Sequence, residues 1–326
     1  MPSAKTKGIL AIICSAFGFA LMALFVRLCD DCGAPVSSFQ KSFFRNVVAL
    51  AIAAAAWRRA RAGRRGLETG DGRRATGEDV RRETKDVLSL RSKFLLFLRS
   101  LLGTVGIFAN FYALSRITIA EGQTLNKTAP FFTVLFAWLF LGEKAMRRQV
   151  LPLAVAFAGV VLIAKPGFAG ATAFPLAMGL LGGACAGGAY ACVRALRKRA
   201  VDPAFIILFF SAFSCLASVP FMLAGFDPMT WRQVLILFGA GAGAAMGQFG
   251  VTLAYGYVAP REIAVFDYSN ILFTAAFGYL FFAQVPDIWS VLGFAAILVA
   301  AFLTARRERG PSVSNQRRKF VRRRKS

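Results

Sequence analysis

Long apolar segments alternate with short polar ones along most of the chain. Ten of these segments hold roughly 17–24 residues, enough for a helix to cross a hydrocarbon core about 30 Å thick. The pattern therefore predicts an all-α integral membrane protein with ten transmembrane helices, the first of them an uncleaved span and not a signal peptide. The predicted spans are 8–28, 36–57, 94–115, 119–141, 149–165, 174–193, 203–224, 233–256, 262–283 and 287–305.

The second half of the chain repeats the first. Segment 262–284 has the layout of segment 121–143, which lies 141 positions earlier, and the alignment has no gap. Two repeats of five spans follow, at 8–165 and 174–305. Because five is an odd number, the second repeat is expected to be inverted in the membrane. Aligned pairs include Gly106 with Gly247, Glu121 with Glu262, Thr133 with Thr274, and Leu162 with Leu303.

Each repeat carries a polar stripe in its fourth span, with spacing i, i+3, i+7 along one helix face. A polar stripe facing lipid is costly, so both stripes are expected to face an interior cavity. Within the first stripe, Pro130 removes one backbone hydrogen bond, and we expect a hinge there. The stripes are Asn126, Ala129 and Thr133 in the first repeat, and Asp267, Asn270 and Thr274 in the second.

Positive charge is distributed unevenly. With the N-terminus inside, the inner loops and tails hold 32 of the 40 Lys and Arg residues, and the outer loops hold three. This bias predicts a multi-pass protein of the cytoplasmic (inner) membrane with both termini in the cytoplasm. Residues 58–93, which are rich in glycine and charge, predict a flexible cytoplasmic loop. Residues 306–326 predict a disordered polybasic tail at the inner membrane surface, and no nucleic-acid partner is expected.

Four charged residues fall well inside predicted spans: Arg45, Arg99, Lys127 and Asp267. Ionisable groups there are costly, and they indicate either a functional site or a structural network between helices. In inverted repeats Lys127 should lie outside the midplane and Asp267 inside it, too far apart for a direct ion pair. Asp267 is therefore expected near Arg99. For Lys41, one turn outside Arg45, the simplest interpretation is snorkelling to the outer interface.

Several short motifs resemble those of a known family. They are RSLLG (99–103), FYAL (111–114), LNKTAPFF (125–132), LFLGEK (139–144), FDYSN (266–270) and PDIWSVLG (286–293). With the gapless repeat, the chain resembles EamA-type members of the drug/metabolite transporter superfamily over 8–305. The resemblance implies two inverted five-helix repeats, a central cavity and alternating access. Family members move amino acids, purine-type metabolites, vitamins, adenosylated compounds or drugs.

These observations predict a secondary transporter. Arg45, Arg99 and Lys127 outnumber Asp267 by two charges, and a bound anion would offset that excess. The expected substrate is a small polar metabolite, amino-acid-like and either carboxylate-bearing or zwitterionic. Alternatives are an exporter of hydrophobic drugs, and a signalling or assembly protein without transport activity. The candidate substrate-binding residues are Lys127, Asn126, Asp267, Asn270, Tyr268, Arg45, Arg99, Thr133 and Thr274, with Pro130 as the hinge.

A membrane enzyme is not expected. The chain has no histidine, and Asp267 is the only carboxylate well inside a predicted span, so neither a paired-carboxylate site nor a His-based metal site is indicated. No cofactor is expected. The expected partners are the small-molecule metabolite and the lipid bilayer, and the sequence leaves open coupling to protons or an exchanged solute, and a monomer or homodimer.

Overall fold

All regular structure in the described residues is helical, with no strand among them. The computed structural model describes residues 3–34, 36–69, 89–114, 116, 125–142, 147–164, 173–283, 285 and 288–307. Its helices are α1 (Ala4–Asp31), α2 (Ser38–Thr69), α4 (Leu90–Leu114), α6 (Ala129–Leu141), α7 (Arg147–Ala164), α8 (Ala173–Lys198), α9 (Pro203–Ala224), α10 (Trp231–Tyr257), α11 (Pro260–Asp267), α12 (Ser269–Phe282) and α13 (Ile288–Arg307).

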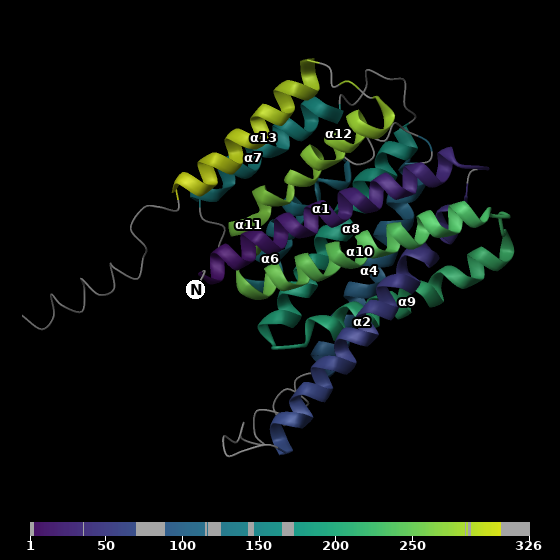
Figure 1. The fold of residues 1–326 in the computed structure, drawn as a ribbon. Coiled ribbons are helices and arrows are strands. Elements are labelled where there is room, and N and C mark those ends of the chain that lie inside the picture. The colour runs from purple at the N-terminus through teal and green to yellow at the C-terminus, as the bar shows by residue number, and fades with distance from the viewer. Residues whose placement is uncertain are drawn as a thin grey trace, which may run out of the picture.

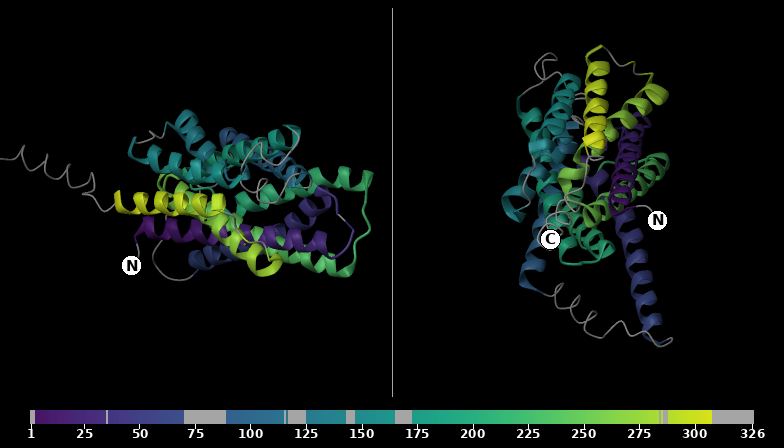
Figure 2. Two further views of the ribbon diagram at one scale, coloured as in Figure 1. Left: turned by 90° about the horizontal axis from the view of Figure 1, so that it is seen from above. Right: turned by 90° about the vertical axis from the view of Figure 1, so that its left-hand side faces the viewer.

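Six stretches of the described chain are long and apolar enough to cross a membrane. They correspond to α1, α4, α8, α9, α10 and the run from α11 through α12. Apolar side chains are widely exposed on the outside of the bundle, as expected where lipid replaces water. The first residues of α1 and the last residues of α13 lie at the same end of the bundle (Figure 2).

The helices that pack most extensively come from opposite halves of the chain. The most extensive pairs are α1 with α10, α4 with α8, α13 with α7, and α2 with α9. Figure 1 shows α7 and α13 side by side along one flank of the bundle. A buried apolar cluster around Ile12, Leu196, Tyr255 and Ile263 joins α1, α8, α10 and α11.

Glycines let the paired helices approach closely. On α1, a Cβ added at Gly18 would lie 2.7 Å from the backbone nitrogen of Gly247 on α10. Between α4 and α8, a Cβ added at Gly182 would lie 3.1 Å from the carbonyl oxygen of Gly106. Gly106 and Gly247 are 141 positions apart, so both halves use the same position for close backbone contact.

The predicted loop 58–93 is partly helical, and this corrects the prediction at its two ends. Helix α2 continues to Thr69 and extends beyond the rest of the bundle in Figure 1, while α4 already begins at Leu90. Alanine and arginine are strong helix formers, which outweighs the scattered glycines here. Arg61 also lies over the Trp57 ring, 4.8 Å from its centroid, one turn away. Residues 70–88, and the predicted tail beyond residue 307, lie outside the described residues.

Candidate functional site

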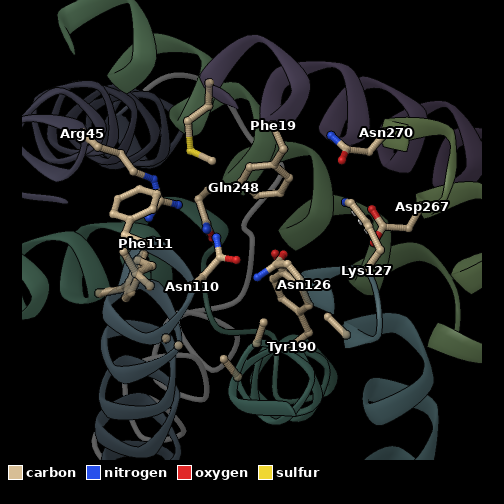
Figure 3. Close-up of a pocket in the computed structure, with 18 of the residues that line it drawn as sticks. Phe19, Arg45, Asn110, Phe111, Asn126, Lys127, Tyr190, Gln248, Asp267 and Asn270 are labelled. Atoms are coloured by element: carbon tan, nitrogen blue, oxygen red, sulfur yellow. Dashed lines mark ion pairs between the residues drawn. The ribbon is translucent and has the colours of Figure 1, made fainter. Parts of the chain in front are cut away.

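A polar cavity of about 80 Å³ lies in the interior of the bundle (Figure 3). Side chains from α1, α2, α4, α8, α9, α10 and α11 line it, together with residues where the predicted fourth and ninth spans are interrupted. Its charged lining residues are Arg45, Arg99, Lys127 and Asp267. The cavity therefore brings together the four charges that the sequence buries in predicted spans.

The predicted fourth span is broken just before Pro130. Lys127 and Thr128 form a turn, and α6 begins at Ala129, so Pro130 sits in the first helical turn. Proline is well accommodated there because the N–H groups of a first turn have no partner within the helix. The Thr128 hydroxyl donates to the carbonyl oxygen of Leu125 at 2.7 Å and closes the turn. The interruption thus lies in the turn that precedes Pro130, whose missing N–H would otherwise bond to the carbonyl oxygen of Asn126. A hinge at this place stays a prediction.

The predicted ninth span is broken at the equivalent place. Helix α11 ends at Asp267 and α12 begins at Ser269, with Tyr268 between them. The Ser269 hydroxyl donates to the carbonyl oxygen of Phe266 at 2.7 Å. This bond lies 141 positions after the bond at Thr128, although Pro130 is replaced by Ile271. The short hydroxyl residue is thus common to both breaks, and the proline is not.

Lys127 and Asp267 form an ion pair across the two breaks. Lys127 Nζ lies 3.9 Å from Asp267 Oδ2, and Figure 3 shows the two side chains together at one end of the cavity. This overturns the expectation that Asp267 and Lys127 lie too far apart for a direct ion pair. That expectation treated both spans as continuous helices. The breaks release the chain from helical geometry, and the long lysine side chain covers the remaining distance.

Glycines on α8 make room for the first break. A Cβ added at Gly183 would lie 2.7 Å from the carbonyl oxygen of Leu125 and would also meet the Thr128 hydroxyl. One turn further along α8, a Cβ added at Gly187 would lie 2.9 Å from the backbone nitrogen of Thr133. The small face of α8 therefore seats the segment that carries Asn126 and Lys127 against the cavity.

Arg99 and Arg45 supply unpaired cationic donors to the cavity. Arg99 Nη2 donates to Gln248 Oε1 at 2.8 Å, and its guanidinium carbon lies 3.5 Å from the centroid of the Phe210 ring. Nε and Nη1 of both arginines are buried without a hydrogen-bond partner among the described residues. Buried polar groups are normally satisfied, so four unpartnered guanidinium nitrogens indicate space for an acceptor.

The remaining predicted site residues divide into two groups. Asn126 and Asn270 line the cavity, and Asn270 Nδ2 also donates to the carbonyl oxygen of Ala16 at 2.7 Å. Thr133, Tyr268 and Thr274 do not line it. The Thr133 hydroxyl donates to the carbonyl oxygen of Ala129 in its own helix at 2.8 Å. Tyr268 is buried in an apolar cluster with Leu153 and Ala300.

Lys41 lies outside the cavity lining. Its Nζ is 2.6 Å from Asp30 Oδ1, and the lysine is buried. The residue therefore does not reach open water as a snorkelling lysine would, because Asp30 at the end of α1 provides the counter-charge.

Sequence reasoning missed several uncharged members of the site. Asn110, Tyr190 and Gln248 line the cavity, and Asn110 and Gln248 lie between Arg45 and the Lys127–Asp267 pair in Figure 3. A polar residue in the middle of an apolar span was the available signal. Phe210 gave no such signal, because the sequence does not distinguish a phenylalanine that lines a cavity from one that faces lipid.

A helical bundle with apolar outer surfaces and a charged interior cavity defines an integral membrane protein with an internal polar site. Residues 6–165 match the EamA-like transporter family. The chain is 31% identical over 230 residues to the pseudopaline exporter CntI of Pseudomonas aeruginosa strain UCBPP-PA14, covering 70% of this chain and 81% of that protein. It is 29% identical over 213 residues to a riboflavin transporter of Rhizobium johnstonii, covering 64% of this chain and 69% of that protein.

More distant relatives cover most of the chain. Solute carrier family 35 member G1 of Mus musculus is 26% identical over 330 residues, covering 92% of this chain and 80% of that protein. One solved crystal structure shares the fold with a TM-score of 0.64 at 20% identity, covering 94% of this chain and 99% of that one. The protein is thus a membrane transporter. It belongs to the EamA-like transporter family.

Proposed function

We propose that the protein is a secondary transporter of a small carboxylate-bearing or zwitterionic metabolite, working by alternating access across the cytoplasmic membrane. The observation that carries the proposal is the pair of arginines, Arg45 and Arg99, whose buried Nε and Nη1 atoms lack partners among the described residues. A carboxylate accepts such donors in charge-assisted hydrogen bonds, and guanidinium groups suit its planar geometry.

The charges around the cavity fit an anion. Lys127 is neutralised by Asp267 at 3.9 Å, so the formal excess of two positive charges resides on Arg45 and Arg99. Two uncompensated buried cations are unfavourable, and a bound carboxylate lowers that cost. The site therefore favours an anion at the arginine end without requiring the Lys127–Asp267 pair to open.

The opposite end of the cavity suits an amine or another polar group. Asp267 and the side-chain oxygen of Asn126 are acceptors there, while Asn110 and Gln248 lie in the middle. A zwitterion of amino-acid type would place its carboxylate at the arginines and its ammonium group toward Asp267. The aromatic faces of Phe19 and Tyr190 would border the carbon skeleton between them.

Alternating access is supported by the symmetry of the helix pairs. If α1 to α7 form one five-span repeat and α8 to α13 the other, the contact between α1 and α10 is equivalent to that between α8 and α4, and both are extensive. The contacts of α2 with α9, and of α7 with α13, are then self-equivalent. A two-fold arrangement of this kind suits two inverted repeats that rock about a shared central site.

The relatives support transport and leave the solute open. Their names specify a pseudopaline exporter and riboflavin transporters, which handle different solutes, so membership in the family does not define the cargo. The carboxylate preference rests on this chain's own arginines.

Paired ligands test the proposal directly. Amino acids and organic acids, each with its neutral methyl ester, are compared as stabilisers of the purified protein in thermal unfolding and as solutes in proteoliposomes. The native chain should prefer a carboxylate to its ester by at least about tenfold, the scale of a charge-assisted hydrogen bond. Arg45→Gln and Arg99→Gln should remove most of that preference.

The matched control is Arg27→Gln, which removes a partly exposed arginine paired with Asp31 near the end of α1. It should leave the preference unchanged. Stabilisation by lipophilic monocations, with no response to any carboxylate, would instead support a hydrophobic drug exporter. Absence of solute flux for every ligand that stabilises the protein would support a role without transport.

A further inference from the structure

A second hollow, on the outside of the bundle, differs in character from the polar cavity. It is a groove of about 800 Å³ between α4, α6 and α8. Its floor on α8 consists of small residues, and its walls are long apolar side chains of α4 and α6. Phe94 and Phe140 are 60% and 75% exposed at its rim, so the groove opens toward lipid. The floor residues are Ala184, Cys185, Gly188, Ala191, Cys192 and Ala195.

The length of the groove along the helices matches the thickness of one leaflet of a bilayer. Its lining residues on α4 run from Arg91 to Leu102. Eleven residues at a rise of 1.5 Å extend about 16 Å, or half of a hydrocarbon core about 30 Å thick. A single acyl chain of one leaflet matches this length.

Charge is confined to one end of the groove. Arg91 begins the lining on α4, while Lys198, the last residue of α8, and Arg199 directly after it end the lining at the other helix. The first turn of α4 and the last residues of α8 therefore meet at the same end. The described lining contains no acidic residue, so the described charges at that end are all positive and suit a phosphate group.

We propose that this groove binds one anionic phospholipid, with an acyl chain against the small residues of α8 and the headgroup phosphate at Arg91 and Arg199. The apolar floor and walls would hold the acyl chain apart from the surrounding lipid, and the two arginines would favour an anionic headgroup. Lipid binding here is separate from solute binding, because the groove and the polar cavity share no lining residue.

The second half of the chain supplies a matched control. Arg232, 141 positions after Arg91, is exposed at the start of α10. The counterpart of the groove residue Phe136 is Phe277, and Phe17 of α1 packs against it with ring centroids 5.9 Å apart. Arg232→Gln thus removes an arginine from the equivalent helix position in the second half, where the Phe17 ring covers the surface that corresponds to the groove.

Native mass spectrometry of the full-length protein tests the proposal, with equal amounts of phosphatidylglycerol and phosphatidylcholine added in detergent. The protein should retain one phosphatidylglycerol in preference to phosphatidylcholine. Arg91→Gln with Arg199→Gln should lower that retention at least tenfold, since each charge near a membrane surface contributes about fivefold in affinity. Arg232→Gln should leave retention unchanged, and Ala195→Phe should lower retention of both lipids by filling the groove.

Three outcomes would overturn the proposal. The first is equal retention of the two phospholipids by the native chain. The second is an equal loss in the Arg232→Gln variant and in the double variant. The third is displacement of phosphatidylglycerol by soluble sn-glycerol 3-phosphate, which would show a phosphate site without an acyl-chain groove.

Discussion

The ion pair between Lys127 and Asp267 leads to a quantitative prediction about stability. The two side chains are only 7% and 10% exposed, and their charged atoms lie 3.9 Å apart. At an effective dielectric constant of about 20, two unit charges at this distance attract by about 4 kcal/mol. Removing one partner of a buried pair leaves the other charge uncompensated and costs about 3–5 kcal/mol. Asp267→Asn and Lys127→Met should therefore each lower the free energy of unfolding by about 3–4 kcal/mol.

The double variant separates the pair from its surroundings. With both charges removed, neither member of the pair is left behind as an uncompensated charge, so the loss should be smaller than the sum of the two single losses by about 3 kcal/mol. Reversible unfolding in mixed micelles with increasing dodecyl sulfate, followed by tryptophan fluorescence, measures all three variants. The control is Arg27→Met, whose pair with Asp31 is 42% and 44% exposed, and which should cost less than about 0.5 kcal/mol.

Additive losses in this cycle would refute the reasoning. A coupling energy below about 0.5 kcal/mol would mean that each charge is stabilised by other groups and that their proximity contributes little. Both residues would then be available to a solute independently, and the charge distribution of the cavity would have to be reconsidered.

Three further changes have defined outcomes. Gly142 and Ala283 follow the last residues of α6 and α12 and have left-handed φ angles of 63° and 51°, which glycine adopts more easily than alanine. Gly142→Ala should therefore lower the free energy of unfolding by about 1 kcal/mol, and Ala283→Gly should raise it by about 1 kcal/mol. Gly183→Ala should cost about 1–3 kcal/mol in unfolding, because the new methyl group meets the carbonyl oxygen of Leu125. Gln40 on α2 exchanges hydrogen bonds of 2.9 Å with the backbone of Asp227, in the loop after α9. Because these bonds hold the ends of α2 and α9 together, Gln40→Ala should open that end of the bundle. An impermeant thiol reagent added on the side of the membrane where Gln40 lies should then label an introduced cavity cysteine more strongly.

Hydropathy predicted the helical class well because helix length and apolar composition are local properties. The helices α1, α9 and α10 begin and end within a few residues of the spans expected at 8–28, 203–224 and 233–256. For the charged segment after the second span, hydropathy alone led to a wrong prediction. Residues 58–69 fall in the predicted loop because they cannot bury a core, but α2 shows that a helix can extend beyond the bundle without one.

The site was predictable in its charges and not in its geometry. Arg45, Arg99, Lys127 and Asp267 were identifiable because each is costly in an apolar span, and all four line one cavity. The contact between Lys127 and Asp267 was not, because it depends on a break at Tyr268 that no glycine or proline marks. Local sequence does not report such a break. It is stabilised by a short hydroxyl–carbonyl bond and by the helices packed around it.

The two halves share a backbone plan and differ in the chemistry that they bring to the centre. The counterpart of Lys127 is Tyr268, and the counterpart of Arg99 is Ala240. Asp267 stands where the first half has Asn126, and it supplies the counter-charge of Lys127 in the observed ion pair.

This divergence leaves the arginines as the uncompensated charges of the cavity. Arg45 and Arg99 both come from the first half, and the second half contributes neutral partners to Arg99, the Gln248 amide and the Phe210 ring. Neither neutral partner cancels the positive charge. The cavity therefore has one cationic end and one paired end, and this polarity would give the carboxylate of the proposed substrate a single preferred orientation.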